Sequence, residues 1–219
     1  MNLHTLVRWN AVLTGWIALV VSVCGAAAPP QTKEDGFVPL FDGKTLDGWE
    51  GNLDYWTARD GMIVGDSPGI KHNEFLCTKQ EFEDFELRVT FRILGDETKN
   101  SGVQFRSKRV PNNKEVSGYQ ADVGQHYWGC LYDESRRNKV LVQAPAEELA
   151  KVVKKDDWNT YVIRCEGPRI TLTLNGLKTV DYTEKDDAIP RKGIIGLQIH
   201  GGNALQAQFK AIRIKRLNQ

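Results

Sequence analysis

"DFELRVTFRIL", residues 84–94, alternates between apolar and polar side chains. Its apolar positions are Phe85, Leu87, Val89, Phe91 and Ile93. Because successive side chains of a strand point to opposite faces of a sheet, this alternation predicts a long strand with one buried and one polar face.

The same period-two pattern recurs along the chain, interrupted by Gly, Asn and Asp. Residues 170–174 alternate into Asn175–Gly176, a dipeptide typical of a tight hairpin turn. Further strands are expected after a turn at Asp60–Gly61 and at residues 102–107, 119–124, 160–166, 193–200 and 207–217, with one brief helix at 146–153. Many short strands separated by turns indicate an all-β chain that forms one sandwich or barrel domain.

The first 28 residues have the pattern of a secretory signal peptide. Arg8 gives a positive start, residues 11–23 are apolar, and small residues follow. Cleavage is expected after Ala26 or Ala27, because Pro29 disfavours a cut directly before it. The alternatives are an uncleaved anchor, for which the apolar run is short, and a lipoprotein modified at Cys24. Residues 29–36 then form a linker, and residues 37–217 form an exported domain, periplasmic or secreted.

The charge balance limits the classes of partner. The chain has 29 Lys and Arg against 28 Asp and Glu, and loss of Arg8 with the leader leaves 28 of each. A surface with balanced charge has no excess of positive charge with which to bind nucleic acid or an anionic membrane. The mature chain keeps Cys77, Cys130 and Cys165, whose wide spacing is no metal-binding motif. Buried thiols are expected, with one disulfide and a free thiol as the alternative.

Three of the expected strands carry polar side chains on the face opposite to the core. Alternation places Val103, Phe105, Tyr119, Ala121, Val123, Ile195, Leu197 and Ile199 inward. The outward positions are then Gln104, Arg106, Gln120, Asp122, Gln198 and His200. If these strands are neighbours, the side chains form a polar surface for a hydroxyl-rich ligand. The alternative is an ordinary solvated sheet face.

The segment after Gly124 is expected to be a loop that adds aromatic and charged groups. Its aromatic candidates are Trp128 and Tyr132, and its charged candidates are Glu134, Arg136 and Arg137. Aromatic rings cover the C–H faces of a pyranose while polar groups bind its hydroxyls, so this composition favours a sugar site. The alternatives are packing of the rings under the loop and a surface ion-pair cluster.

His200 stands at a strand end, next to Gly201–Gly202 and in phase with Gln198. An imidazole there can act as a base or a metal ligand near neutral pH, although a single His is more often structural. His72 and His126 are weaker candidates. The histidine spacing gives no metal motif, so any metal would be assembled from distant strands.

Several phrases together identify a family resemblance. "FVPLFDGKTLDGW", "NSGVQFRS", "GYQADVG", "DDWNTYVIRCEGPRITLTLNG", "GIIGLQIHGG" and "FKAIRIKRL" resemble the exported bacterial 3-keto-disaccharide hydrolases, also described as 3-keto-glucoside lyases or hydratases, from Phe37 to Leu217. The resemblance implies a concanavalin A-like sandwich (jelly roll) of two antiparallel sheets with its site on the concave face. It also implies glycosides already oxidised to a ketone at C3. Many members have Glu where this chain has Gln120, which leaves Asp122 as the acid of that strand.

A C3 ketone acidifies the C2 proton, so a base can expel the aglycone by elimination, and hydration then completes a net hydrolysis. His200 or Asp122 is the expected base. Arg106, with or without a divalent metal, would stabilise the enolate, while Gln104, Gln120 and Gln198 orient hydroxyls. A sugar C3 oxidoreductase must act upstream. A non-catalytic carbohydrate-binding module is the main alternative, and an interaction domain of a larger assembly is a third.

Overall fold

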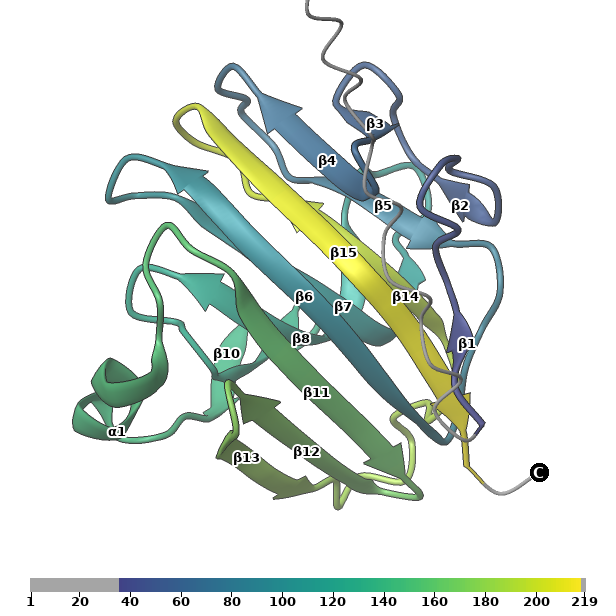
Figure 1. The fold of residues 1–219 in the computed structure, drawn as a ribbon. Coiled ribbons are helices and arrows are strands. Elements are labelled where there is room, and N and C mark those ends of the chain that lie inside the picture. The colour runs from purple at the N-terminus through teal and green to yellow at the C-terminus, as the bar shows by residue number, and fades with distance from the viewer. Residues whose placement is uncertain (1–35, 218–219) are drawn as a thin grey trace, which may run out of the picture. The chain divides into compact units, whose positions relative to one another are not determined.

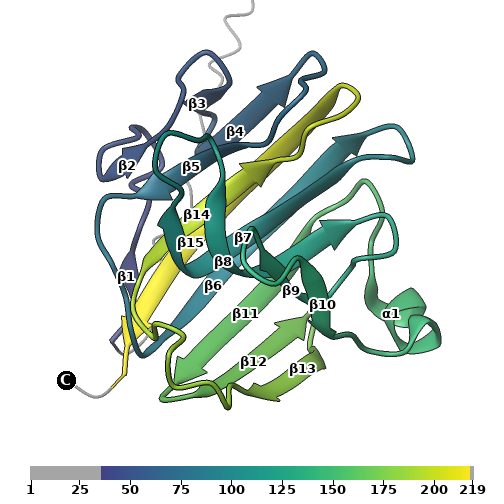
Figure 2. The same cartoon turned by 180° about the vertical axis from the view of Figure 1, so that it is seen from behind.

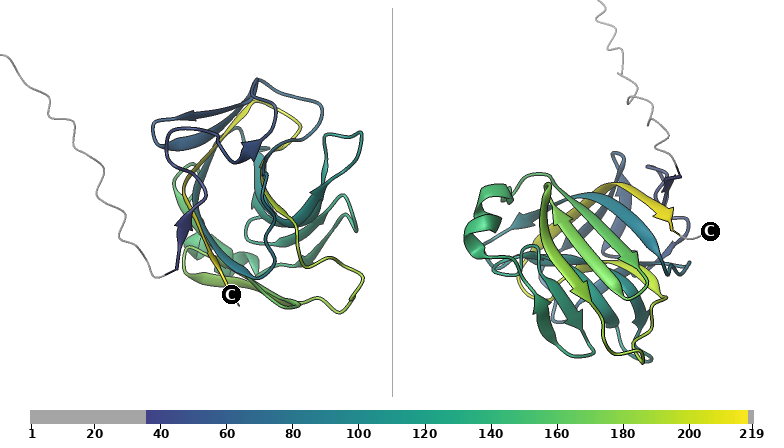
Figure 3. Two further views of the ribbon diagram at one scale, coloured as in Figure 1. Left: turned by 90° about the vertical axis from the view of Figure 1, so that its right-hand side faces the viewer. Right: turned by 90° about the horizontal axis from the view of Figure 1, so that it is seen from below.

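Two antiparallel sheets pack face to face around a shared apolar core (Figures 1 and 3). The computed structural model describes residues 36–217. The predicted signal peptide and nearly all of the predicted linker lie outside these residues. Within residues 36–217, no helix is long and apolar enough to cross a membrane. The predicted all-β antiparallel sandwich is confirmed.

The first sheet, sheet A, contains the long strand predicted at residues 84–94. In spatial order its strands are β13 (Leu177–Thr183), β12 (Arg169–Leu174), β11 (Asn159–Glu166), β6 (Phe85–Gly95), β15 (Leu205–Arg216), β4 (Met62–Ser67) and β3 (Trp56–Arg59), and β1 (Val38–Pro39) pairs with β15. The five apolar side chains of β6 that alternation points inward are 0–1% exposed. The Asn175–Gly176 turn joins β12 to β13, as predicted.

The second sheet, sheet B, contains the three strands with polar outward positions. Its order is β10 (Lys139–Val142), β9 (Leu131–Glu134), β8 (Val116–Gly124), β7 (Asn100–Arg109), β14 (Ile194–Ile199), β5 (Glu74–Thr78) and β2 (Trp49–Glu50). The helix α1 (Ala146–Val152) follows β10. The three strands β8, β7 and β14 are direct neighbours, so their polar faces form one surface. We call the face of sheet B that points away from sheet A its outer face.

Part of the segment after Gly124, expected to be a loop, forms two short strands. A turn at residues 125–130 leads into β9, and Tyr132 of β9 lies opposite Gln120 of β8. Strand β10 then pairs with β9. Strands of four residues contain too few alternations to stand out in the sequence. The three cysteines of the described chain are buried and free, as the thiol interpretation predicts.

The β7–β8 hairpin bends over the outer face of sheet B. Its pairing register shifts between Phe105 and Lys108, where Arg106 has a φ of 47°. A Cβ on Gly118, across the hairpin, would lie 2.2 Å from Ser107 Oγ, so only glycine allows this approach. Figure 2 shows strands β7 and β8 on this side of the molecule. Beyond the bend, Val116 packs on Phe75 and Cys77. The hairpin therefore forms a wall on the β5 side of the outer face.

The same bulge turns Arg106 away from the outer face, so the prediction that it points outward on the same face as Gln104 is wrong. Its guanidinium donates to Glu83 O at 2.9 Å and to Gly167 O at 2.8 Å, and it pairs with Asp84 Oδ1 at 2.9 Å. The side chain is 2% exposed. These partners flank strands of sheet A, so Arg106 ties the two sheets together. Ser107 lies beside Gln104 instead, with its Oγ 2.8 Å from Gln104 Oε1.

We expect Arg106→Ala to lower the free energy of unfolding by about 3 kcal/mol or more, because it removes the cation of a largely buried ion pair and leaves two carbonyls without their donor. Urea unfolding measures this loss. Arg109→Ala is the matched control: its side chain, on the same strand, is 36% exposed and pairs with Glu50. The control should lose about 1 kcal/mol or less. Equal losses in both variants would contradict the structural role of Arg106.

Candidate functional site

The predicted glutamines meet in rows that run across sheet B. Gln104 of β7 lies opposite Gln120 of β8, and Gln120 lies opposite Tyr132 of β9. On the other side of β7, Gln104 lies opposite Gly196 of β14. Gln198 is two residues further along β14 and therefore shares its face with Gly196. The register thus brings together side chains that lie far apart in the sequence.

Hydrogen bonds join these side chains into one network. Gln104 Nε2 donates to Gln120 Oε1 at 2.8 Å. Gln120 Nε2 donates to Asp122 Oδ2 at 3.0 Å and to Gln198 Oε1 at 3.2 Å. We call Gln104, Gln120, Asp122 and Gln198 the amide floor. Its four residues are 0–4% exposed, so the alternative of an ordinary solvated sheet face does not hold here.

Gly102 allows Gln120 to reach across β7. Gly102 lies opposite Asp122 in the sheet. A Cβ at Gly102 would lie 2.5 Å from Gln120 Cδ and 2.8 Å from its Nε2. The space without a side chain is therefore filled by the Gln120 amide, which touches strands on both sides. Any larger residue at Gly102 would displace the centre of the network.

Asn100, which the sequence did not single out, is the second amide bound to Asp122. Its Nδ2 donates to Asp122 Oδ1 at 3.2 Å, and the residue is 4% exposed. Asn100 Oδ1 and Gln198 Nε2 are buried atoms without a hydrogen-bond partner among the described residues. The first is an acceptor and the second a donor, so each is available to a hydroxyl of a ligand. Asn100 precedes the expected strand at 102–107, although it keeps the same alternation as Gly102 and Gln104.

Asp122 is the titratable group of the amide floor. Burial raises the pKa of its carboxyl from 3.8 to about 7, although hydrogen bonds from Gln120, the Val123 backbone and Asn100 favour the ionised form. The negative charge of Glu134 adds to the rise. Near neutral pH this carboxyl therefore changes its protonation state, as a general base or acid does.

Strand β9 forms one border of the amide floor. Tyr132 and Glu134, two residues apart on this short strand, are both partly exposed. Burial raises the pKa of Glu134 from 4.5 to about 7, and the charge of Glu115 on the bent hairpin contributes. Tyr132 thus places an aromatic ring beside Gln120, and Glu134, opposite Gly118, adds a second carboxyl on the same strand. The two residues therefore lie on the strand next to the polar face, as the sequence predicted.

His200 directly follows β14 and is partly exposed. Its Nδ1 lies 2.6 Å from Gly201 O, a contact that requires a proton on Nδ1. In the neutral ring, Nε2 is then the acceptor, the form of a base or metal ligand. The following loop is held by a hydrogen bond from Gly201 N to Asn73 Oδ1 at 2.9 Å.

The predicted candidates Arg136 and Arg137 are not at the amide floor. Arg136 pairs with the fully buried Asp133 at 2.7 Å. Arg137 pairs with Asp133 as well and with Glu184 at 2.7 Å. The guanidinium of Arg136 lies 4.5 Å from the centre of the Tyr119 ring. For these two arginines the alternative of an ion-pair cluster therefore holds. Alternation along β9 points Asp133 inward, away from the side of Tyr132 and Glu134, and both arginines follow Asp133.

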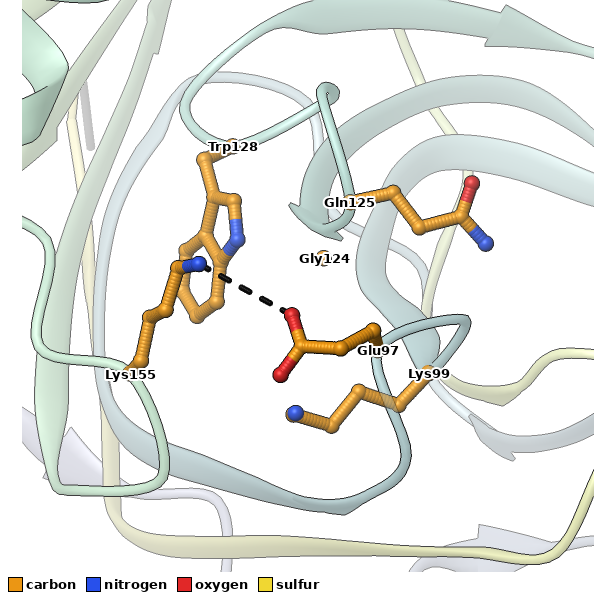
Figure 4. A pocket seen from close by; sticks show the side chains of 6 residues that line it. All are labelled: Glu97, Lys99, Gly124, Gln125, Trp128 and Lys155. Carbon is orange, nitrogen blue, oxygen red and sulfur yellow. Dashed lines mark ion pairs between the residues drawn. The ribbon is translucent and has the colours of Figure 1, made fainter.

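Trp128 belongs mainly to the core, which agrees with the alternative that its ring packs under the loop. It stacks on Phe91 with ring centres 6.3 Å apart, and it is 7% exposed. Its remaining edge lines a hollow of about 180 Å³ at the end of the sandwich (Figure 4). Lys155 and Glu97 face each other across this hollow at 3.8 Å. A larger hollow of about 380 Å³ adjoins it and shares Trp128, Gln125 and Lys155.

Among residues 36–217, no three His, Cys, Asp or Glu side chains lie close enough together to hold a metal ion. Both oxygens of Asp122 accept hydrogen bonds from amide groups instead. The possible divalent metal therefore stays a prediction.

Comparison with known proteins identifies related sequences and folds. The model of the family described as 3-keto-alpha-glucoside-1,2-lyase-like domain matches residues 36–215. Two solved structures of glycosyl-hydrolase-like proteins from Parabacteroides distasonis are similar to this chain. The first has 19% sequence identity and a TM-score of 0.62, and the match covers 84% of this chain and 94% of the other. The second has 25% sequence identity and a TM-score of 0.61, and the match covers 83% of this chain and 99% of the other. The carbohydrate binding module CBM66 from Bacillus subtilis shares the fold. It has 16% sequence identity and a TM-score of 0.59, and the match covers 81% of this chain and 99% of the module. A search of curated proteins finds no match.

We expect Asp122→Asn to change how stability depends on pH. In the native protein the pKa of Asp122 is about 7, against 3.8 as the ordinary value. The folded state therefore keeps a proton that the unfolded state has lost, and stability falls as the pH rises through this interval. Between pH 5 and pH 8 the loss from this group is about 2–3 kcal/mol. The amide introduced by the substitution does not titrate. Between pH 5 and pH 8 the variant should therefore lose about 2–3 kcal/mol less of its free energy of unfolding than the wild type loses.

Urea unfolding at pH 5 and pH 8 measures the difference. Any constant cost of altered hydrogen bonds cancels when the two pH values are compared. Asp187→Asn is the control, because this side chain is 91% exposed, and it should follow the wild type. Parallel pH dependence in wild type and Asp122→Asn would show that the Asp122 carboxyl titrates at its ordinary pKa.

Proposed function

The chain belongs to the 3-keto-alpha-glucoside-1,2-lyase-like domain family, and from this premise we propose that it cleaves the glycosidic bond of 3-keto-glycosides. The family and the similar folds support a carbohydrate-related function. The observation that carries the finer proposal is Asp122, a buried carboxyl with a pKa of about 7 in the amide floor. A single base of this kind is what elimination next to a ketone requires.

The proposed reaction begins with proton transfer from C2 of the sugar to the Asp122 carboxylate. The C2–H electron pair forms the enolate of the C3 ketone. When the ketone re-forms, the C1–C2 double bond forms and the C1–O bond to the aglycone breaks. The leaving oxygen takes up the proton that Asp122 accepted from C2, which restores the carboxylate. Water then adds its hydroxyl to C1 and a proton to C2, so the net result is hydrolysis.

In the proposal, the supporting roles pass to the amides. Gln104 and Gln120 use their polar atoms within the network, so in the proposal they hold Asp122 and Gln198 in place. Gln198 Nε2, a buried donor without a partner among the described residues, takes the role of enolate donor that Arg106 cannot fill. Tyr132 offers its ring to the sugar from the next strand.

His200 is the second candidate base. Its Nε2 has the acceptor form, and its ring is more accessible than the Asp122 carboxyl. We assign the base to Asp122, because burial among amides gives it both a fixed orientation and a pKa near neutrality. In this proposal His200 borders the site and binds a substrate hydroxyl.

A carbohydrate-binding module is the second candidate function. It is supported by the shared fold of CBM66 and by the deep burial of the amide floor. A binding module would retain affinity for a sugar and release no product. In the favoured proposal the protein is exported, and a sugar C3 oxidoreductase supplies its substrate.

We expect turnover only after oxidation at C3, because the mechanism uses the acidity of C2–H next to a ketone. Methyl glucoside and methyl 3-keto-glucoside form a matched pair, and NMR follows their products. Release of methanol from the keto form alone supports the proposal. Equal turnover of both would rule out elimination, and binding without product from either would favour the binding module.

We expect Asp122→Asn to lower kcat/KM for a 3-keto-glucoside by about 10²-fold or more, the usual effect of losing a general base. The wild-type rate should rise with pH through an apparent pKa near 7, as the carboxylate forms. His200→Ala should keep this inflection. Profiles of kcat/KM between pH 5 and pH 8 for the two variants separate the candidates. If the inflection vanishes in His200→Ala and stays in Asp122→Asn, the base is His200.

A further inference from the structure

The larger hollow beside α1 lies at the end of a path of aromatic rings that starts at the amide floor. We propose that this hollow is the subsite for the aglycone, and that it selects glycosides whose aglycone is a flat aromatic group. This inference rests on the proposed function, because it concerns the second half of the same substrate. It adds a specificity site that lies outside the amide floor.

The hollow has the size and lining of an aromatic binding site. Its volume is about 380 Å³, while a cavity of about 150 Å³ is enough for a benzene ring. One wall is helix α1 and its flanks, which contribute Ala144, Ala146, Leu149, Ala150 and Val153. The opposite wall is the turn between β8 and β9, with His126 and the edge of Trp128. Apolar walls with two rings favour a flat aromatic ligand.

Polar groups stand around this apolar lining. Gln125, Gln143 and Lys155 belong to its border, and the Lys155 side chain is 70% exposed. Gln143 Nε2 also donates to His126 O, a contact that joins the two walls. Donors at the border of an apolar slot suit the oxygen substituents of a phenolic ring.

The hollow is continuous with the site through neighbouring rings. Tyr132 lies opposite Gln120 of the amide floor. The Tyr127 ring meets the Tyr132 ring edge-on, with centres 6.0 Å apart. The His126 ring lies 4.0 Å from that of Tyr127 and also lines the hollow. A row of three neighbouring rings therefore leads from the predicted sugar position to the hollow.

The bent hairpin decides the direction in which a ligand longer than one ring extends. On the β5 side, Val116 covers Phe75 and Cys77, and Asn73 bonds to Glu115 at 3.2 Å, so this side is closed. On the β9 side, Tyr132 and Glu134 are partly exposed, so a ligand has access over this strand. A sugar on the amide floor thus directs its aglycone over β9, toward His126 and α1.

Ala150→Trp tests the subsite by filling it. Ala150 lines the hollow and is exposed, so a larger side chain does not enter the core. Two substrates are compared: 4-methylumbelliferyl 3-keto-glucoside and methyl 3-keto-glucoside. The variant should raise KM for the aryl substrate about tenfold or more and leave KM for the methyl substrate within about twofold. Glu147→Trp, on the same helix and not in the lining, is the matched control and should resemble the wild type.

Free 4-methylumbelliferone gives a readout that does not depend on turnover. Fluorescence titration should show binding to the wild type and to Glu147→Trp, and a loss of affinity of about tenfold or more in Ala150→Trp. If neither glycoside is cleaved, the proposed function fails, and this titration still decides the binding site. Unchanged affinity in Ala150→Trp, or equal effects on both glycosides, would overturn the aglycone subsite. Thermal unfolding of each variant verifies that it is folded.

Discussion

The geometry of the outer face depends on one amide group, that of Gln120. It donates to Asp122 and Gln198 and accepts from Gln104, so it connects all members of the amide floor. It reaches both sides because Gly102 leaves space on the strand between. A carboxylate at this position would lack both donors and would stand about 3 Å from Asp122, where like charges repel strongly. A glutamine here therefore leaves one carboxyl in the network and orients it.

Burial of that carboxyl has a cost in stability. An ionised carboxylate is stable in a protein interior only when hydrogen bonds replace its water, and Asp122 receives such bonds from Gln120, Asn100 and the Val123 backbone. These bonds do not offset burial completely, so its pKa remains raised to about 7. The negative charge of Glu134 on strand β9 adds to this rise. Burial of Asp122 thus lowers the stability of the ionised protein and gives it a group that titrates near neutral pH.

Alternation predicted the sheet faces wherever the strands were regular. It placed Gln104, Gln120, Asp122 and Gln198 correctly, and neighbouring strands then brought them together. It failed at Arg106, because a bulge adds one residue and reverses the face from that point. It could not place Arg136 and Arg137, because four-residue β9 was not recognised and Asp133 inside it draws both guanidiniums away. Asn100 was missed although its alternation was regular, because the expected strand began too late.

The distinction between binding a sugar and cleaving it depends on a narrow physical difference in such a sandwich. Amides, rings and hydroxyls suffice to bind a pyranose, and their charge does not change with pH. A base must exchange a proton near the working pH, which an exposed carboxylate with a pKa of about 4 does poorly. In sheet B, Asp122 is 4% exposed, and amides take the place of water around its carboxyl. In the proposed function, desolvation of Asp122 is the property that distinguishes a 3-keto-glycoside-cleaving enzyme from a lectin of the same fold.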